Sequence, residues 1–364
     1  MRRAVALALV AAAALGAPPA PARTADAAPP RAAAAAAPVR LAGPDRDVVG
    51  LAVAGATAFA LLDPGEADGP FSLVRVSGAR AARVAVVGAP GSEFPMLAAR
   101  GSRVATAWDQ PISGGVVYLA QARRAAAPVA LHTGTGPGRL ALTSDGAAVV
   151  AHPDTTGDLA VTTTPGVAGR AAAGAAPSTV RLSADAPRRR HFAAGLALRG
   201  DEPLVLDLVQ QRRRSELRVA GEGAPAAPVT GVGALRVLEG ALAATRDRIA
   251  VAYVSRGRPV LATAAPGGAW RRRTLSGSGV DGAPAVALAG GTALVAWSQP
   301  GLGGRRDVRL AVAGPSSRIH TRWLTRTTAD ERPPLLASGP TGRVVAAWSS
   351  AERTARVPWF VRVR

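Results

Sequence analysis

Arginine clusters are the side chains of this sequence best suited to binding a ligand, because a guanidinium group pairs in bidentate fashion with phosphate or carboxylate. The 364 residues include 44 basic ones, all of them arginine, and the formal net charge is +20. Residues 43–160 hold 9 arginines against 10 acidic residues, whereas residues 161–364 hold 30 against 13. This asymmetry indicates a basic surface on the second half of the chain, of the kind that attracts polyanions.

Codon usage accounts for some of these arginines. Lysine and asparagine are absent and isoleucine occurs three times, which is typical of a GC-rich coding sequence. Codon usage does not explain why one half of the chain is favoured, or why arginines gather in short groups. The candidate anion-binding residues are Arg188, Arg189, Arg190, Arg212, Arg213, Arg214, Arg256, Arg258, Arg305 and Arg306. The alternative is a solvated charged surface without a ligand.

Metal and cysteine chemistry have little support. The chain has no cysteine, which excludes disulfides, thiolate metal ligands and a cysteine nucleophile. Its four histidines are scattered without the short spacing of a metal site: His132, His152, His191 and His320. We expect structural roles for them, no cofactor and no metal.

Hydrolytic chemistry is the remaining enzymatic possibility. A glycosidase needs two carboxylates at a fixed separation, but the carboxylates of the expected loops form no paired motif, and we expect them to be solvated: Asp63, Glu66, Asp68, Asp109 and Asp154. A sialidase needs a tyrosine nucleophile, and the two tyrosines, Tyr118 and Tyr253, lie in apolar runs. We therefore expect no catalytic residue.

The first residues resemble an export signal. Arg2 and Arg3 precede an apolar run at residues 4–16 that is too short to span a bilayer, and small residues follow it. We predict a signal peptide at 1–28, a disordered Ala/Pro spacer at 29–37 and a folded domain at 38–364. The mature protein is expected outside the cytoplasm, without a transmembrane segment.

A repeated phrase organises the rest of the chain. Alternating Val and Ala lead to an aromatic residue in Arg103–Trp108, Arg248–Tyr253, Thr292–Trp297 and Arg343–Trp348, with weaker copies elsewhere. The positions that end each copy are Leu61, Trp108, His152, Leu208, Tyr253, Trp297 and Trp348, spaced 44 to 56 residues apart. This period is typical of a four-stranded propeller blade. We expect these blade-core residues to be buried.

The strand pattern predicts an all-β, seven-bladed β-propeller of four-stranded antiparallel blades, with six or eight blades as alternatives. Val-rich runs of four to eight residues are bounded by Gly and Pro, which favours strands and turns over helices. The last unit lacks an outer strand, and residues 38–42 resemble one. We therefore predict that residues 38–42 complete the last blade and close the ring.

The Ala-Val-Ala-Trp phrase at this period resembles that of secreted β-propeller repeat proteins of GC-rich Gram-positive bacteria, over roughly residues 38–364. Sialidase-like propellers share the blade plan, but their Ser-x-Asp-x-Gly-x-x-Trp turn motif is absent, with only Ser144-Asp145-Gly146 as a fragment. The resemblance implies a blade core and no particular chemistry.

Three functions remain open on the sequence, the last of them a purely structural module of a larger envelope assembly, which predicts an apolar patch instead of a basic rim. The first is a non-catalytic binding scaffold for a protein partner or for an anionic extracellular polymer held on an arginine-rich loop face, without specific recognition of nucleic acid. The second is a carbohydrate-active hydrolase or lyase with carboxylates at the mouth of the channel. Converging carboxylates with perturbed pKa values would favour the enzyme.

Overall fold

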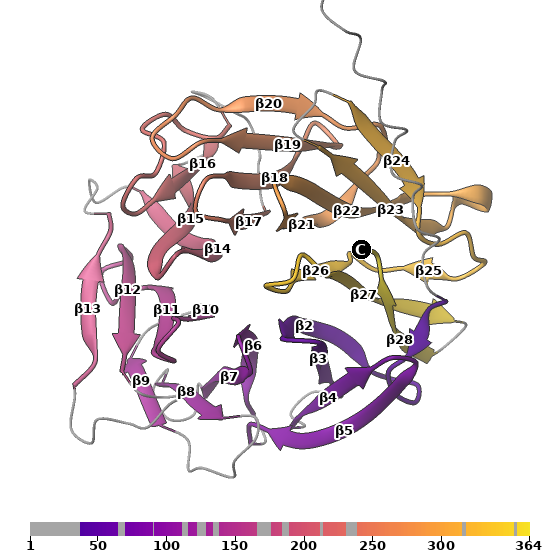
Figure 1. Cartoon of the computed structure of the whole chain (residues 1–364), viewed down its shortest axis with the longest axis horizontal. Helices are drawn as coiled ribbons and strands as arrows, with labels where there is room; N and C mark the ends of the chain where they lie inside the picture. Colours follow the sequence, from indigo (N-terminus) through magenta and orange to yellow (C-terminus); the bar gives the residue numbers. More distant parts are fainter. Residues whose placement is uncertain are drawn as a thin grey trace, which may run out of the picture. The chain divides into compact units, whose positions relative to one another are not determined.

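The structure is a computed structural model that describes residues 37–64, 70–89, 91–110, 116–121, 129–133, 138–165, 176–183, 189–211, 214–230, 239–314, 318–352 and 355–364. Their secondary structure is β, apart from one short 3-10 helix, η2 (Leu302–Gly304). They form seven antiparallel sheets arranged in a ring (Figure 1). The predicted β-propeller is confirmed. The predicted signal peptide and most of the spacer lie outside the described residues.

Each blade is a meander of consecutive strands from the inside of the ring outward. The first three blades are β2 (Asp47–Ala54), β3 (Thr57–Asp63), β4 (Phe71–Ser77) and β5 (Arg80–Val87); β6 (Glu93–Arg100), β7 (Arg103–Gln110), β8 (Val116–Gln121) and β9 (Val129–Thr133); and β10 (Arg139–Leu142), β11 (Ala148–Pro153), β12 (Leu159–Thr164) and β13 (Ser178–Arg181). The fourth blade has three described strands, β14 (Arg190–Arg199), β15 (Glu202–Gln211) and β16 (Arg214–Ala220).

The last three blades follow the same plan. The fifth and sixth are β17 (Gly240–Ala244), β18 (Ile249–Ser255), β19 (Arg258–Ala264) and β20 (Arg271–Thr274), then β21 (Asp281–Ala289), β22 (Thr292–Pro300), β23 (Arg306–Ala313) and β24 (Ile319–Trp323). The seventh contains β25 (Asp330–Glu331), β26 (Leu335–Ser338), β27 (Val344–Glu352), β28 (Ala355–Arg362) and β1 (Val39–Arg40).

The ring closes through its first strand, as the sequence predicted. β1 pairs antiparallel with β28, placing Val39 opposite Phe360, and the Leu41 amide donates to the Pro358 carbonyl at 2.9 Å. Leu41 is 5% exposed and packs in a cluster that contains side chains of the first and last blades. The closing strand therefore covers the edge of β28, which would otherwise present unpaired backbone groups.

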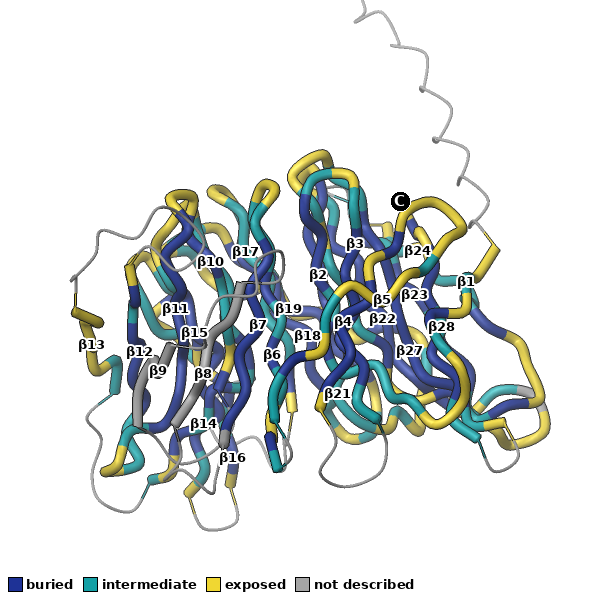
Figure 2. The backbone as a smooth tube through the Cα atoms, turned by 90° about the horizontal axis from the view of Figure 1, so that it is seen from below, coloured by how far each residue is buried: buried dark blue, intermediate teal, exposed yellow. Residues whose placement is uncertain are grey.

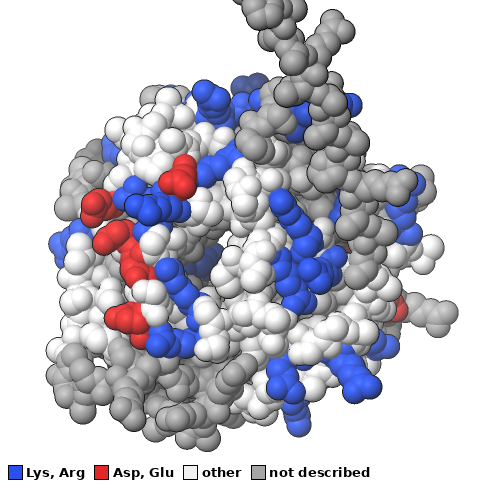
Figure 3. Space-filling model, in the orientation of Figure 1, with Lys and Arg blue, Asp and Glu red and all other residues white. Residues whose placement is uncertain are grey.

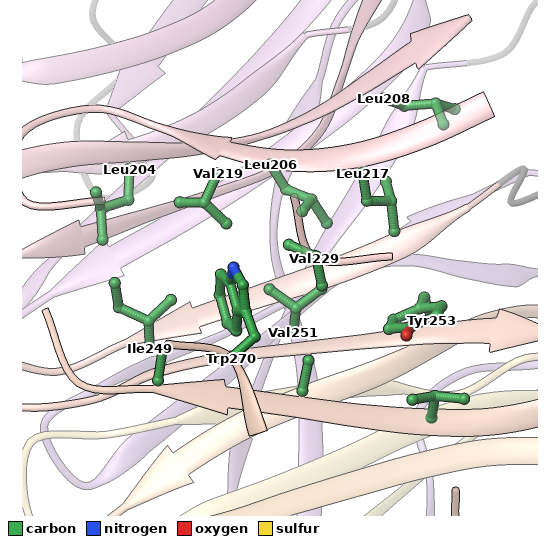
Figure 4. Packing of buried hydrophobic residues seen from close by; sticks show 13 residues of the cluster. Leu204, Leu206, Leu208, Leu217, Val219, Val229, Ile249, Val251, Tyr253 and Trp270 are labelled. Atoms are coloured by element: carbon green, nitrogen blue, oxygen red, sulfur yellow. The ribbon is translucent and has the colours of Figure 1, made fainter. Parts of the chain in front are cut away.

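Apolar side chains fill the space between neighbouring blades. In Figure 4, Leu206 and Leu217 of the fourth blade face Val251 and Tyr253 of the fifth, with Trp270 between the two sheets. All seven blade-core positions are buried: Leu61, Trp108, His152, Leu208, Tyr253, Trp297 and Trp348. The repeat phrase thus marks the second strand of each blade, where both faces of the sheet are covered.

Arginine also joins blade to blade. The first residue of the phrase is arginine in three copies, and each guanidinium donates to a carbonyl in the first hairpin of the following blade: Arg103 to Ser144, Arg248 to Gly291, and Arg343 to Ala56. The last of these links the seventh blade to the first. Some of the positive charge is therefore structural and is not available to a ligand.

The strand order creates two faces (Figure 2). The inner-turn face carries the hairpins that join the first two strands of each blade, such as β2 and β3. The connection face carries the hairpins that join the second and third strands, together with the links to the next blade. Within the described part of the chain, no helix is long and apolar enough to cross a membrane.

Candidate ligand-binding face and pocket

The connection face holds the described members of the predicted arginine groups. Arg189 and Arg190 lead into β14, Arg214 begins β16, Arg256 and Arg258 form the β18–β19 hairpin, and Arg305 and Arg306 end the β22–β23 loop. They therefore come from three consecutive blades, the fourth to the sixth. Arg188, Arg212 and Arg213 lie outside the described residues.

Backbone geometry fixes two of these arginines closely. The β18–β19 hairpin has Arg256 and Gly257 as its central residues, with φ of 51° and 71°. Two positive φ values define the type I′ turn that matches the twist of adjacent strands. The Arg256 backbone has a conformation that residues other than glycine rarely adopt. The hairpin thus holds Arg256 and Arg258 outward on a short rigid tip.

Five of these arginines are exposed, whereas Arg306 is neutralised within the protein. Arg306 forms ion pairs with Asp281 at 3.0 Å and Asp330 at 3.7 Å. The exposed ones are Arg190, Arg214, Arg256, Arg258 and Arg305. We call these five residues the basic crescent. On the same face the third blade instead presents Asp154 and Asp158, both paired with Arg181 at 2.8 and 3.6 Å. The charge asymmetry of the sequence is thus also present on the connection face.

A pocket of about 720 Å³ opens on the connection face where the sixth and seventh blades meet. Its walls come from the β22–β23 loop, the link between β24 and β25, the β27–β28 hairpin and the residue before β1. They include Arg305 and Arg326, Glu331 and Glu352, and Trp348 and Trp359. Arg305 belongs to both the pocket and the basic crescent, so the two features are continuous.

Glu331 is the most unusual group in this pocket. It is 2% exposed, and burial raises its pKa to about 7, with the neighbouring Asp307 and Glu352 carboxylates adding to the shift. The Thr327 hydroxyl donates a hydrogen bond to Glu331 Oε1 at 2.9 Å, and the Ser350 hydroxyl also bonds to the carboxyl. These hydrogen bonds lower the pKa and so offset part of the rise. No hydrogen bond of ordinary geometry reaches Oε2 from a described residue. A carboxyl with this pKa changes its protonation state close to neutral pH.

We expect Glu331→Gln to stabilise the protein at alkaline pH by up to about 3 kcal/mol, and to leave its stability unchanged at pH 4. Below the ordinary pKa of 4.5 the carboxyl is protonated in both the folded and unfolded states. Between 4.5 and about 7 only the unfolded state releases the proton, so wild-type stability falls as pH rises, and the loss is complete above about 7. Glutamine removes that dependence.

Urea unfolding at pH 4 and pH 8 measures the difference. The exposed Glu352→Gln is the matched control and should change little at either pH. A Glu331→Gln variant that is equally destabilised at both pH values would contradict the buried-carboxyl interpretation.

Trp348 brings a second unsatisfied polar group to the pocket. In the sixth blade, the equivalent Trp297 donates its indole N–H to Gln299 Oε1 at 2.7 Å. The seventh blade has Ser350 at the position of Gln299, two residues after the tryptophan, and its side chain is shorter. The Trp348 Nε1 is buried and has no hydrogen-bond partner among the described residues. A buried donor left in this state costs stability.

The buried histidines form hydrogen bonds within the blades. His152 takes the place of the blade-core tryptophan, with Nδ1 3.0 Å from the Pro153 carbonyl and Nε2 2.9 Å from Thr162 Oγ1, and burial lowers its pKa. His191 Nδ1 lies 2.8 Å from Asp207 Oδ2, and both side chains are buried. Among the described residues no group of three His, Asp or Glu side chains could hold a metal ion. Asp109 is 4% exposed, so the expectation that it is solvated is wrong.

The inner-turn face has a different character. Asp201, in the β14–β15 hairpin, accepts hydrogen bonds from the Ser144 amide and hydroxyl at 2.7 and 2.5 Å and pairs with Arg100 at 3.1 Å. This network joins the second, third and fourth blades. Figure 3 shows acidic and basic side chains interleaved on the left of one face and mainly basic ones on its right. The Asp201 carboxylate is neutralised by Arg100 and hydrogen-bonded to Ser144, so this network links neighbouring blades.

Comparisons with known proteins identify the fold of this chain. No family model and no curated protein matches it. The β-propeller domain of Myceliophteria thermophila Cps50 (Swd1) is similar over 89% of this chain and 99% of that domain, with 10% identity and a TM-score of 0.55. The β-propeller domain of the Trilobed protease from Pyrococcus furiosus, described as having an open velcro topology, covers 88% and 98%, with 8% identity and a TM-score of 0.54.

A larger enzyme shows the same architecture. A puromycin-hydrolyzing peptidase from Mycobacterium tuberculosis is similar over 90% of this chain, with 18% identity and a TM-score of 0.55, but the match spans only 54% of that enzyme. At these identities the similarity shows the fold alone. The chain is a β-propeller protein, and its first strand pairs with its last blade.

Sequence reasoning found the arginine groups but missed the pocket. Glu331 stands in the polar segment Asp330-Glu331-Arg332-Pro333-Pro334, which is typical of a solvated loop. Its burial depends on β25 pairing with β27, where Glu331 lies opposite Ser350. The one available signal was Ser350, which replaces Gln299 of the preceding repeat.

Proposed function

We propose that this protein is a binding propeller, exported from the cytoplasm by the predicted signal peptide, that holds an anionic polymer on its connection face. The observation that carries the proposal is the basic crescent: five exposed arginines contributed to one face by three consecutive blades. Guanidinium groups on such a rim can contact successive phosphates or carboxylates along an extended chain. The arginines stand on strands and hairpins of a folded ring, so binding orders their side chains but needs little ordering of the backbone.

Neutralising part of the crescent should weaken the salt dependence of binding. In the triple variant Arg214→Gln, Arg256→Gln and Arg258→Gln, the slope of log affinity against log salt for linear polyphosphate should fall by up to about three, roughly one for each lost phosphate contact. Fluorescence anisotropy of labelled polyphosphate from low to physiological salt measures the slope.

The matched control changes the net charge equally at another place. Arg271, Arg272 and Arg273 lie on β20, the outer strand of the fifth blade, and are exposed. Their triple replacement by glutamine should leave most of the slope intact. Equal losses in both variants would mean that only overall charge matters, and wild-type binding that does not vary with salt would contradict the proposal.

A hydrolase is the second candidate function, and the pocket between the sixth and seventh blades favours it. Glu331, with a pKa raised by burial to about 7, and the exposed Glu352 both line this pocket. Glycoside hydrolysis uses two carboxyl groups, and its general acid is a carboxyl whose pKa is raised, as that of Glu331 is. A screen of wild type against Glu331→Gln for release of reducing ends from acidic polysaccharides tests it. Activity in wild type that disappears in the variant would favour the enzyme over the scaffold.

A further inference from the structure

The pocket between the sixth and seventh blades is lined by two buried side chains, each with one polar atom that no described residue meets with a hydrogen bond of ordinary geometry. Glu331 is 2% exposed and has no hydrogen bond of ordinary geometry at Oε2, and Trp348 is 2% exposed and has no partner at Nε1, within the described chain. Both side chains line the same pocket of about 720 Å³. Burying such groups without a partner costs free energy, which a ligand that supplies the missing hydrogen bonds recovers.

The chemistry of this pair selects the kind of ligand group. An indole N–H can only donate, and an ionised carboxylate can only accept. A hydroxyl group does both, so neighbouring hydroxyls can accept from Trp348 and donate to Glu331. The bridged phosphates inside a polyphosphate chain carry no O–H group and only accept, so they would satisfy Trp348 but not an ionised Glu331.

Aromatic side chains form an apolar wall beside these groups. Trp348 on β27 and Trp359 on β28 are direct cross-strand neighbours, so their side chains lie on the same face of the blade. Trp359 is half-buried and also lines the pocket. An indole partly open to a polar pocket can pack against the apolar C–H face of a sugar ring.

Arginines supply the complementary charge at the same pocket. Arg305 and Arg326 line it, and both are exposed. Arg305 forms no ion pair with a described residue, and Arg326 lies 6.0 Å from the Trp323 ring. Guanidinium groups at these positions can pair with a carboxylate of the ligand.

We infer that the pocket lined by Glu331, Trp348, Trp359 and Arg305 binds one uronic-acid ring of an acidic polysaccharide. The inference rests on the proposed function, because it names the anionic polymer held by the connection face. The ring hydroxyls bond to Glu331 and Trp348, the ring packs on Trp359, and the carboxylate meets the arginines.

The test is titration calorimetry with trigalacturonate, which carries both hydroxyls and carboxylates, on wild type, Glu331→Gln and Trp348→Phe. Glu331→Gln replaces one acceptor oxygen of the carboxylate with an amide NH2 donor, and Trp348→Phe removes the indole donor. Each variant should weaken binding about tenfold. Trp297→Phe is the matched control, because that indole already bonds to Gln299, and it should leave the affinity unchanged. Maltotriose, which lacks carboxylates, should bind at least tenfold more weakly than trigalacturonate.

Polyphosphate, titrated in parallel, separates this inference from the proposed function. Loss of trigalacturonate affinity in Glu331→Gln and Trp348→Phe, with polyphosphate binding unchanged, supports the pocket. Equal trigalacturonate affinity in wild type and both variants overturns the pocket, while salt-dependent polyphosphate binding leaves the crescent standing. Absence of polyphosphate binding with a pocket-dependent trigalacturonate signal overturns the crescent alone.

Discussion

Replacing Trp297 with alanine is expected to lower the free energy of unfolding by about 3–5 kcal/mol, the range for removal of a large buried aromatic side chain. Trp297 is fully buried at the end of the repeat phrase and packs against side chains of the fifth blade, including Leu261. The substitution also leaves Gln299 without its buried hydrogen bond. Urea unfolding followed by circular dichroism measures the effect.

Trp323→Ala is the control for this prediction. Trp323 lies on the outer strand β24, is half-buried, and stacks under the Arg309 guanidinium at 4.9 Å from the ring centre. Losing this half-buried cation–π contact should cost about 1–2 kcal/mol. If Trp297→Ala costs no more than Trp323→Ala, the blade-core interpretation of the repeat phrase is wrong.

Disrupting the closing strand should have a similarly large effect. Leu41→Pro removes a buried side chain and the amide that donates to the Pro358 carbonyl, so we expect a loss of about 3–5 kcal/mol. The exposed edge of β28 should also promote self-association, because it offers unpaired backbone groups to another chain. Unfolding curves and size-exclusion chromatography over a range of concentrations measure the two effects.

Arg40→Ala provides the comparison, since the Arg40 side chain is exposed and donates to the nearby Ala42 carbonyl. It should change stability by less than about 0.5 kcal/mol. A Leu41→Pro variant with wild-type stability and a single monomeric peak would show that the ring holds without its closing strand.

The two faces of the propeller suggest a division of roles for its arginines. Arg103, Arg248 and Arg343 hold neighbouring blades together through backbone carbonyls. The basic crescent lies on the opposite face, and its arginines form no such bond to the next blade among the residues that the structure describes. A high net charge alone would not distinguish these groups, because both contribute equally to it.

The sequence by itself determined the repeat, the propeller fold and the closure. The Ala-Val-Ala-Trp phrase recurs because the second strand of every blade is buried on both faces. Each copy of the repeat therefore needs apolar residues at these positions. Residues 38–42 could be recognised as an outer strand because they match the outer strand of another blade. Arginine groups could likewise be assigned to one face, since strand alternation decides on which side each loop emerges.

Only the tertiary structure determined the pocket, the burial of Glu331 and its raised pKa. Its burial requires β25 to pair with β27 and the link between β24 and β25 to fold over it, contacts between segments with no shared pattern. Asp307 shows the same effect. Its sequence neighbourhood is typical of a charged residue in a solvated loop, yet the side chain is buried and accepts hydrogen bonds from the Thr325 hydroxyl and the Thr327 amide. Polar residues of connecting segments carry no periodicity, so only the folded ring reveals which of them are removed from water.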